Sequence, residues 1–260
     1  MRLKLKDRIE SYQDSYDYKL LSRLPLVISV NGRTFSKVTS LLDKPYDSKF
    51  VESMLTTVIK LSSEIEGTVF IYYYGDEITI IARNDQNTET CPWFDNKLQK
   101  IVSATSSIAT LYFNKCAASV GLNLFGDALF ISQVFVVPNI VEAINTIIYK
   151  QQANFYSSTN LACYYELLKQ HNKNTIKEML SGLSIDEKID LLRQECGIDF
   201  NNFPAIYRRG AACYKVPKII DGTVKNKWFI NTDIPIFTKD QSFLSNILKS
   251  GTDIFRVESI

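Results

Sequence analysis

The sequence predicts a mixed α/β (α+β) fold built on a ferredoxin-like βαββαβ sheet. Runs of β-branched and aromatic residues, typical of strands, lie at residues 25–30, 68–74, 78–82 and 128–138. Apolar residues at helical spacing follow the first run and precede the last one. This order of elements is that of the split-βαβ motif.

The first βα unit carries clear boundary signals. The first strand is predicted to end at Asn31-Gly32, a pair that tolerates positive φ and is typical of turns. Asp47 then precedes a run of apolar residues at helical spacing, and Gly67 follows that run where a helix is expected to end. These residues therefore predict a strand followed by a helix.

The second half of the motif begins with a hairpin. Its two strands flank a short turn at residues 75–77, which is typical of tight β-hairpins. A long amphipathic segment at residues 93–115 predicts the second helix, and the last strand ends at Pro138. We interpret residues 1–138 as one palm-like domain.

Residues 139–260 are predicted to form a mainly helical region with a late β-hairpin, packed on the first domain. Asn139 with Glu142 favours a helix start, and Ser184 with Glu187 forms a capping-box pattern. The hairpin is predicted from residues 206–217 and 226–231, with Asp221-Gly222 at the turn between them.

Composition narrows the possible classes of protein. A chain of 260 residues that is 45% hydrophobic can bury a substantial core, and no stretch reads as a signal peptide or a membrane span. The five cysteines are scattered without a C-x-x-C pair, so neither a disulfide framework nor a zinc site is indicated. We expect a cytoplasmic protein that does not bind membranes, and the net charge of +2 leaves nucleic-acid binding open.

The predicted topology places two distant segments together. In a split-βαβ sheet the third strand lies between the first two, so Asn31-Gly32 should lie beside Asp76-Glu77. Polymerase palms and nucleotide cyclases carry metal-binding carboxylates at these two places, where two Mg²⁺ ions support phosphoryl transfer. A solvated Gly-Asp turn is the simpler alternative for the hairpin alone. The topology, together with lysines on the second helix, favours a metal and triphosphate site.

Nine sequence blocks indicate a family. They are "DRIESY", "PLVISVNGRTFSKVT", "KPYD", "GDEITI", "TETCPWFDNKLQKIVSATSSIATLYFN", "FISQVFVVP", "YKQQANFYSS", "YRRG" and "TDIPIFTKDQSFL". In this order they resemble the tRNA-His guanylyltransferases and, more closely, the bacterial and viral Thg1-like proteins, which add nucleotides to RNA 5′ ends in the 3′-to-5′ direction. The resemblance covers nearly the whole chain and implies a polymerase-palm-like fold and a homotetramer.

Several polar residues of the family pattern are replaced in this chain. The family aspartate after the first strand is Asn31, whose neutral amide should bind Mg²⁺ more weakly than a carboxylate. The other replacements affect the loop after the first strand, the hairpin, the last strand and the following helix, at Ser36, Tyr74, Gly75, Ile131, Gln133, Lys150, Ala153 and Ser157. A weakened or repurposed enzyme is therefore an open alternative.

The resemblance implies a role for each remaining site residue. The catalytic and metal-binding set is Asp76, Glu77, Asn31 and the Gly32 carbonyl. The nucleotide-binding set is Arg33, Ser36, Lys44, Asp47, Lys97 and Lys100, and the RNA-binding set is Lys150, Lys173, Arg208 and Arg209. For the lysines and arginines outside the palm motif, an ordinary solvated side chain is the simpler interpretation.

Two functions from different classes follow. The first is a Mg²⁺-dependent nucleotidyltransferase that uses ATP or GTP and extends tRNA 5′ ends by two-metal phosphoryl transfer. The second is an inactive relative that binds tRNA or regulates another protein. A nucleotide cyclase is a more distant alternative, because it rests on the palm and the Gly-Asp-Glu turn alone. Binding of Mg²⁺ and a nucleoside triphosphate distinguishes the first two.

Overall fold

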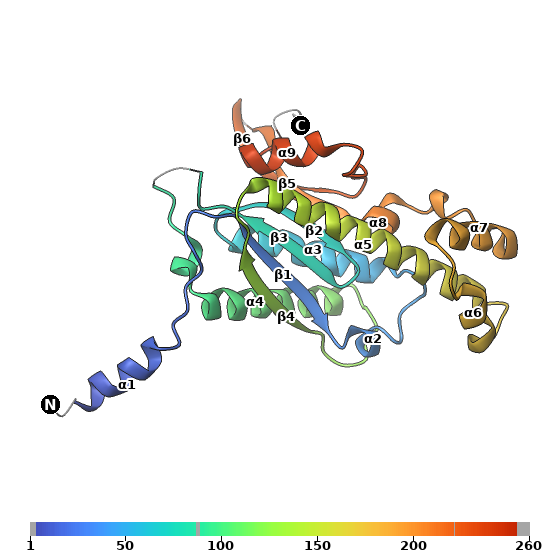
Figure 1. The fold of residues 1–260 in the computed structure, drawn as a ribbon, viewed down its shortest axis with the longest axis horizontal. Helices are drawn as coiled ribbons and strands as arrows, with labels where there is room; N and C mark the ends of the chain where they lie inside the picture. The colour runs from blue at the N-terminus through green and yellow to red at the C-terminus, as the bar shows by residue number, and fades with distance from the viewer. Residues whose placement is uncertain (1–3, 87–88, 221, 254–260) are drawn as a thin grey trace.

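The computed structural model describes residues 4–86, 89–220 and 222–253. Its centre is a six-stranded sheet in the order β4-β1-β3-β2-β5-β6, in which every neighbouring pair is antiparallel (Figure 1). The strands are β1 (Leu26–Arg33), β2 (Thr68–Tyr74), β3 (Glu77–Ala82), β4 (Leu129–Val136), β5 (Ala211–Ile220) and β6 (Thr223–Asn231). The predicted mixed α/β class is confirmed, as is the order of the first four strands.

Helices surround the sheet and fill most of the second half of the chain. They are α1 (Leu5–Asp14), α2 (Phe35–Val38), α3 (Ser48–Glu64), α4 (Leu98–Ser119), α5 (Ile140–Leu167), α6 (Lys173–Leu180), α7 (Ile185–Cys196), α8 (Ala205–Arg209) and α9 (Gln241–Ser250). Two 3₁₀ helices, Trp93–Asn96 and Phe200–Asn202, lie between them. Among the described residues, none of these helices is both long and apolar enough to span a membrane.

Helix ends follow the capping signals of the sequence. The Asp47 carboxylate accepts a hydrogen bond from the Phe50 amide at 3.0 Å and so caps α3. Asn139 caps α5 in the same way, and Ser184 with Glu187 completes the predicted capping box of α7. These boundaries are set locally, which is why the sequence alone predicts them.

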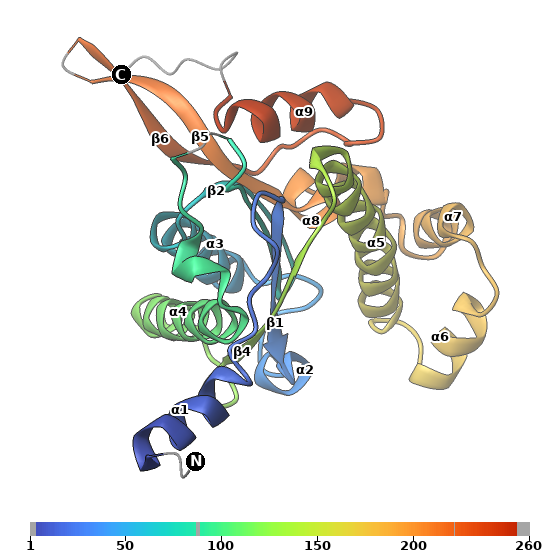
Figure 2. The ribbon, with the colours of Figure 1, turned by 60° about the vertical axis from the view of Figure 1, so that its left-hand side comes forward.

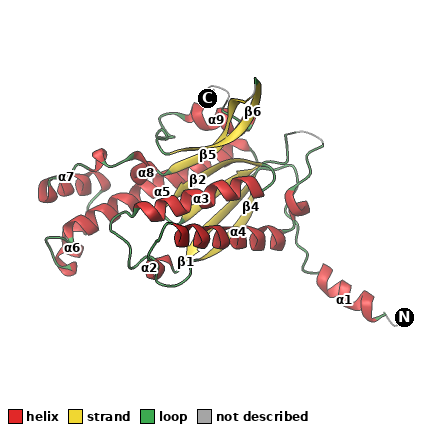
Figure 3. Ribbon diagram, turned by 180° about the vertical axis from the view of Figure 1, so that it is seen from behind, coloured by secondary structure: helices red, strands yellow, loops and turns green. Residues whose placement is uncertain are grey.

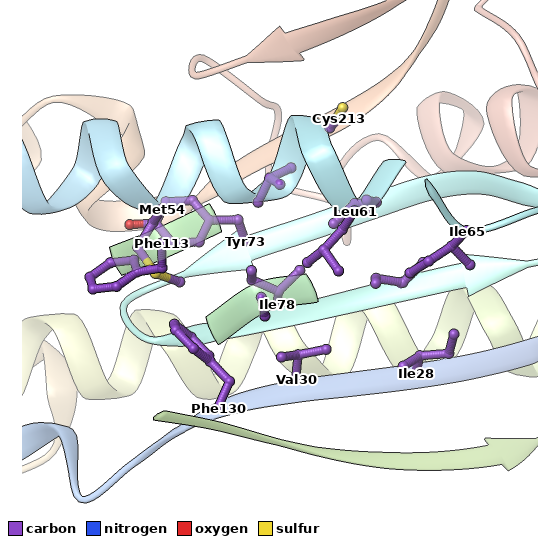
Figure 4. Packing of buried hydrophobic residues seen from close by; sticks show 14 of the residues in the cluster. Ile28, Val30, Met54, Leu61, Ile65, Tyr73, Ile78, Phe113, Phe130 and Cys213 are labelled. Atoms are coloured by element: carbon purple, nitrogen blue, oxygen red, sulfur yellow. The ribbon is translucent and has the colours of Figure 1, made fainter. Parts of the chain in front are cut away.

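The two faces of the sheet are covered by different helices. Helices α3 and α4 lie across one face, as the view from behind shows (Figure 3), and α5 lies on the opposite side of the sheet (Figure 2). The core under α3 and α4 packs Ile28, Val30 and Ile78 of the strands against Met54 and Phe113 of these helices (Figure 4). Val27, Phe70 and Ile81 face the other way and pack with Ile147 of α5. Alternate residues of each strand therefore pack into two different cores, one on each face of the sheet.

The predicted end of β1 and the predicted start of the late hairpin were wrong. β1 does not stop at Asn31-Gly32 but continues to Arg33, because Asn31, Gly32 and Arg33 all pair with residues of β4. The late hairpin begins at Ala211, and the preceding Tyr207–Arg209 are helical in α8, a short helix with Pro204 at its N-cap position.

The late hairpin extends the central sheet, since β5 pairs with β2. Asp221, at its predicted turn, lies outside the described residues. A separate small core of α5, α7 and the 3₁₀ helix at Phe200–Asn202 is built around Cys163, Leu192 and Phe200. The division into domains at residue 138 stays a prediction.

Candidate active site

The end of β1 and the turn between β2 and β3 lie side by side, as predicted (Figure 1). Asn31 pairs with Glu77 across β1 and β3, and the Gly32 amide donates a hydrogen bond to the Asp76 carbonyl at 3.1 Å. These contacts join segments that are 45 positions apart in the sequence, counted from Asn31 to Asp76. The predicted proximity of the two motifs is confirmed.

Gly32 is required at its position by a close contact. A Cβ atom added there would lie 2.3 Å from the ring of Phe35, which is buried in the core of α3 and α4. Any side chain at residue 32 would displace this ring, which packs on Phe113 and Phe130. Gly32 therefore allows the first turn of α2 to fold back against the end of β1.

A cavity of about 540 Å³ opens beside the hairpin turn. Its wall is formed by α2 and the segment that leads to α3, by the turn itself, and by parts of α5 and α8. Four predicted site residues line it: Ser36, Lys44, Asp47 and Asp76. Asn31, Gly32, Arg33 and Glu77 lie next to this cavity but not in its wall. The volume is within the range typical of small-molecule sites.

Asp76 presents a partly buried carboxylate to this cavity. Burial raises its pKa above the ordinary value, the hydrogen bond from its own backbone opposes this shift, and the neighbouring Glu77 adds to it. No ion pair of Asp76 occurs in residues 4–86, 89–220 and 222–253. An anion at this position is thus poorly stabilised by the protein and suited to receive a cation.

Asp76→Asn should raise the stability of the metal-free protein at neutral pH. A carboxyl group whose pKa is raised by folding binds more protons in the folded than in the unfolded state, so its ionisation destabilises the fold. The melting temperature of the variant should exceed that of wild type at pH 7, and the difference should vanish below about pH 4, where both forms are neutral. Melting curves across this pH range without Mg²⁺ test this. A lower melting temperature of the variant at pH 7 would contradict the burial of an unpaired charge.

Glu77 lies on the α5 face of the sheet and is already paired. Its carboxylate forms an ion pair with the ammonium group of Lys150 on α5, and both side chains are about one quarter exposed. Lys150, predicted as an RNA contact, therefore has a partner within the chain. Asn31 stands opposite Glu77 on the same face, so any charge placed at residue 31 would meet this ion pair.

Lys44 and Asp47 both lie in the cavity wall, but Asp47 is held by hydrogen bonds within the chain whereas Lys44 has only weak contacts. The Asp47 carboxylate also accepts a hydrogen bond from the Asp43 amide at 3.3 Å, in addition to capping α3. The Lys44 ammonium lies 5.7 Å from the ring centre of Tyr165, and burial lowers its pKa while Asp47 opposes that shift. Lys44 is therefore a cation held beside the cavity by weak contacts, available to an anionic ligand.

Aromatic side chains in the cavity were missed by sequence reasoning. Tyr46 stacks on Tyr207 with ring centres 4.1 Å apart, and its ring packs edge-on against Phe203. Tyr74 and Tyr165 also line the cavity. The proximity of Tyr46 to Lys44 in the sequence was a usable signal, whereas Tyr165 and Tyr207 reach the cavity only through the packing of α5 and α8. Planar, partly apolar walls of this kind suit a nucleobase or ribose.

Lys97 and Lys100 were predicted to lie beside this cavity, and this prediction was wrong. Lys97 follows Asn96, whose side-chain oxygen accepts a hydrogen bond from Asn84 at 3.4 Å, just beyond the end of β3. That end of β3 is opposite to the Asp76 turn, roughly 15–20 Å away for a strand of this length. Lys97 forms an ion pair with Asp17 there. Lys97 is the N-cap residue of α4 with an extended backbone, and helical spacing could not tell which end of the sheet the two lysines border.

The remaining predicted RNA contacts do not line the cavity. Lys173 is an exposed residue in the first turn of α6. Arg208 donates to the Phe203 carbonyl at 2.7 Å, and Arg209 forms an ion pair with Asp233 at 2.9 Å. Both arginines thus have local structural partners, and the structure brings neither of them into the wall of the cavity.

The fold and the cavity together define an α/β protein with a nucleotide-sized site beside an acidic hairpin turn. The family model described as tRNAHis guanylyltransferase matches residues 6–138, which is about half of the chain. The chain belongs to the tRNAHis guanylyltransferase family, a family of nucleotidyltransferases.

Individual relatives support this assignment at low identity. The chain is 23% identical over 228 residues to tRNA(His) guanylyltransferase 1 of Arabidopsis thaliana, covering 85% of this chain but only 39% of that protein. It is 24% identical over 208 residues to a probable tRNA(His) guanylyltransferase of Dictyostelium discoideum, covering 76% of this chain and 78% of that protein.

Solved structures share the fold over almost the whole chain. A bacterial tRNA(His) guanylyltransferase-like protein in complex with ATP superposes with a TM-score of 0.82 at 25% identity, covering 94% of this chain and 99% of the other. The tRNA(His) guanylyltransferase of Saccharomyces cerevisiae superposes with a TM-score of 0.70 at 17% identity, covering 84% and 94%. The second half of this chain, beyond the family match, thus has the same fold as these proteins.

Proposed function

We propose that this protein adds nucleotides to tRNA 5′ ends in the 3′-to-5′ direction, using ATP or GTP and a polymerase-palm-like active site. The observation that carries the proposal is the convergence of Ser36, Lys44, Asp47 and Asp76 in the wall of one cavity. The bacterial relative that superposes over 94% of the chain was solved in complex with ATP. A nucleotide ligand therefore fits both the cavity and the family.

The residues of the site fit Mg²⁺ delivered with a triphosphate. Mg²⁺ keeps several waters and commonly takes only one or two protein carboxylates, with phosphate oxygens as further ligands. The unpaired Asp76 carboxylate is such a ligand, while the Asn31 amide and the Gly32 carbonyl would bind more weakly. We propose these three residues as the holders of two ions, which would activate a hydroxyl and neutralise a pyrophosphate leaving group.

The protein's own residues supply binding and orientation. Lys44 neutralises phosphate charge, and the aromatic wall formed by Tyr74, Tyr165 and Tyr207 packs against the nucleoside. The RNA 5′ phosphate first attacks the α-phosphorus of a triphosphate and displaces pyrophosphate. The 3′ hydroxyl of the incoming nucleotide then loses its proton and attacks the activated 5′ phosphorus, displacing the nucleoside monophosphate. The Lys150–Glu77 ion pair ties α5 to β3 at the turn that carries Asp76, and so restrains the turn. Holding the two reactants in this geometry is the main contribution expected from the fold.

Lys44→Ala should weaken triphosphate binding about tenfold to a hundredfold. Charge-assisted hydrogen bonds are worth about 1.5–3 kcal/mol, and 1.4 kcal/mol corresponds to a factor of ten. Calorimetric titration with ATP or GTP measures the change. Lys37→Ala is the matched control, because Lys37 lies on the neighbouring helix α2, has its ammonium group 5.1 Å from the ring centre of Phe125 and does not line the cavity. Equal affinities of the Lys44 variant and wild type would place the phosphates elsewhere.

An inactive, tRNA-binding relative remains the second candidate function. Asn31 lacks the charge of a carboxylate, and Glu77 is occupied by Lys150, which supports this alternative. The discriminating experiment is binding of Mg²⁺ with a nucleoside triphosphate, measured by calorimetry with and without the metal. The transferase proposal expects binding that strengthens with Mg²⁺, and the alternative expects tRNA binding without it.

A further inference from the structure

Tyr73 of β2 belongs both to the hydrophobic core and to the wall of the cavity. It is 3% exposed and packs in the core under α3 and α4 with Met54 and Phe113 (Figure 4). Figure 4 shows its hydroxyl oxygen, drawn in red, on the side of the hairpin turn. The same residue lines the cavity that opens beside this turn. Tyr73 thus brings a polar group into an otherwise apolar part of the cavity wall.

The Tyr73 hydroxyl differs from that of the adjacent tyrosine in having no partner. The Tyr72 hydroxyl donates to the Arg209 carbonyl and accepts from the Asn154 amide, both at 2.9 Å. In the part of the chain that the structure describes, no hydrogen bond satisfies the Tyr73 hydroxyl. It is also not one of the unpaired side-chain oxygens of these residues that are sealed from solvent. Because the cavity is the open space that Tyr73 lines, its hydroxyl is available to a ligand there.

The surroundings of this hydroxyl suit a neutral group rather than a phosphate. Gly210, which follows α8, approaches β2 so closely that an added Cβ atom would lie 2.4 Å from the Tyr73 carbonyl oxygen. Burial raises the pKa of Tyr73, and the neighbouring Tyr74, Asp76 and Tyr207 add to this shift, so the hydroxyl stays protonated at neutral pH. None of the groups in the described chain that shift this pKa is a cation, and a phosphate is best bound by cations.

We propose that the Tyr73 hydroxyl forms a hydrogen bond with a ribose hydroxyl of the bound triphosphate and so selects ribonucleotides over deoxyribonucleotides. The inference rests on the proposed function, which assigns the triphosphate to Asp76 and Lys44 and the nucleoside to the aromatic wall with Tyr207. The sugar of a nucleotide joins its base to its phosphates, so it comes to lie between these groups, which are the neighbours of Tyr73.

The chemistry of a tyrosine hydroxyl matches that of a ribose hydroxyl. Each group can donate one hydrogen bond and accept another, so either can supply the partner that the other lacks. A site that presents a buried hydroxyl to a substrate hydroxyl disfavours the analogue without it, because the hydroxyl of the protein is then left unpaired. Tyr73 is therefore a specificity-determining residue for the sugar, and it takes no part in the chemical step.

Tyr73→Phe should not lower the melting temperature of the nucleotide-free protein. The substitution removes one oxygen that has no partner in the described chain, and burying an unpaired hydroxyl costs free energy of folding. Tyr72→Phe is the matched comparison, since it leaves Arg209 and Asn154 without their bonds and should lower the melting temperature. A Tyr73→Phe variant that melts below wild type would show that the fold already uses this hydroxyl, and would overturn the proposal.

Binding of ATP and two deoxy analogues tests the partner of the hydroxyl. Calorimetric titrations in the presence of Mg²⁺ compare wild type and Tyr73→Phe, each with ATP, 2′-deoxy-ATP and 3′-deoxy-ATP. Tyr73→Phe should bind ATP about threefold to tenfold more weakly than wild type, the factor expected for one net hydrogen bond between neutral groups. One of the two analogues should lose the same factor on wild type and should bind both proteins equally. That analogue identifies the ribose hydroxyl that Tyr73 contacts.

The titrations separate a failure of this inference from a failure of the proposed function. Equal binding of ATP by wild type and Tyr73→Phe would overturn the ribose contact and leave the nucleotide site standing. The same holds for an equal loss with all three ligands, which would indicate a contact with the base instead. If wild type binds neither ATP nor GTP nor either analogue, the proposed nucleotide site fails and the ribose contact fails with it.

Discussion

Asp76→Asn should lower nucleotide transfer to a tRNA 5′ end by about a thousandfold while leaving the protein folded. Asp76 is a carboxylate of the cavity wall at the hairpin turn, and it forms no ion pair in the described ranges 4–86, 89–220 and 222–253. Loss of a charged ligand to catalytic metal removes several kcal/mol of transition-state stabilisation, and about 4 kcal/mol corresponds to this factor. The amide keeps the size of the side chain, so the turn should persist.

The measurement is single-turnover incorporation of labelled triphosphate, compared with Asp127→Asn as a control. Asp127 is exposed, lies before β4 and does not line the cavity, so the same chemical change there should leave the rate near that of wild type. Circular dichroism and melting curves establish that both variants are folded. Transfer by Asp76→Asn within threefold of wild type would remove this residue from the catalytic set.

Asn31→Asp should raise transfer by about a hundredfold if the rest of the site is intact. The substitution exchanges an amide for a carboxylate of similar size beside the Asp76 turn, which strengthens the ligand set for Mg²⁺. Recovery of ~2.7 kcal/mol of transition-state stabilisation gives this factor. Ser36, Lys44 and Asp47 remain in the cavity wall, and their persistence favours this outcome.

The same variant should be less stable than wild type without Mg²⁺. The new carboxylate at residue 31 would stand opposite Glu77, and like charges directly across a strand pair are destabilising, although Lys150 offsets part of this repulsion. Mg²⁺ should reverse the loss in melting temperature. Asn226→Asp on the exposed strand β6 is the control for the added charge. No gain in activity and no triphosphate binding by the Asn31 variant would favour the inactive tRNA-binding relative.

The sequence predicted those features that depend on local signals and on topology. Asp47 and Asn139 cap helices through bonds to residues three positions ahead, so their roles are visible in short stretches. The neighbourhood of Asn31 and Glu77 followed from the order of strands, because a split-βαβ unit has few ways to pair. The end of β1 was missed because an Asn-Gly pair favours turns, whereas pairing with β4 on one side and contacts with Glu77 and Asp76 on the other keep it extended.

The rest of the site depends on packing between distant elements. Tyr165 and Tyr207 enter the cavity from α5 and α8, and no local pattern indicates which face of these helices borders it. The partner of Glu77 is Lys150, 73 positions away, so its pairing could not be read from spacing. Lys97 was predicted on a helix face beside the cavity, but it is the extended N-cap residue of α4 and lies at the other end of the sheet.

Extension of a tRNA at its 5′ end is the most direct measure of the central proposal. Wild-type protein is incubated with Mg²⁺, labelled ATP or GTP, and a tRNA that is 5′-monophosphorylated or truncated by one nucleotide. We expect labelled product one or more nucleotides longer at the 5′ end, dependent on both Mg²⁺ and Asp76. No lengthening of any such tRNA, by either wild type or Asn31→Asp, would contradict the assignment of this protein as a 5′-end nucleotidyltransferase.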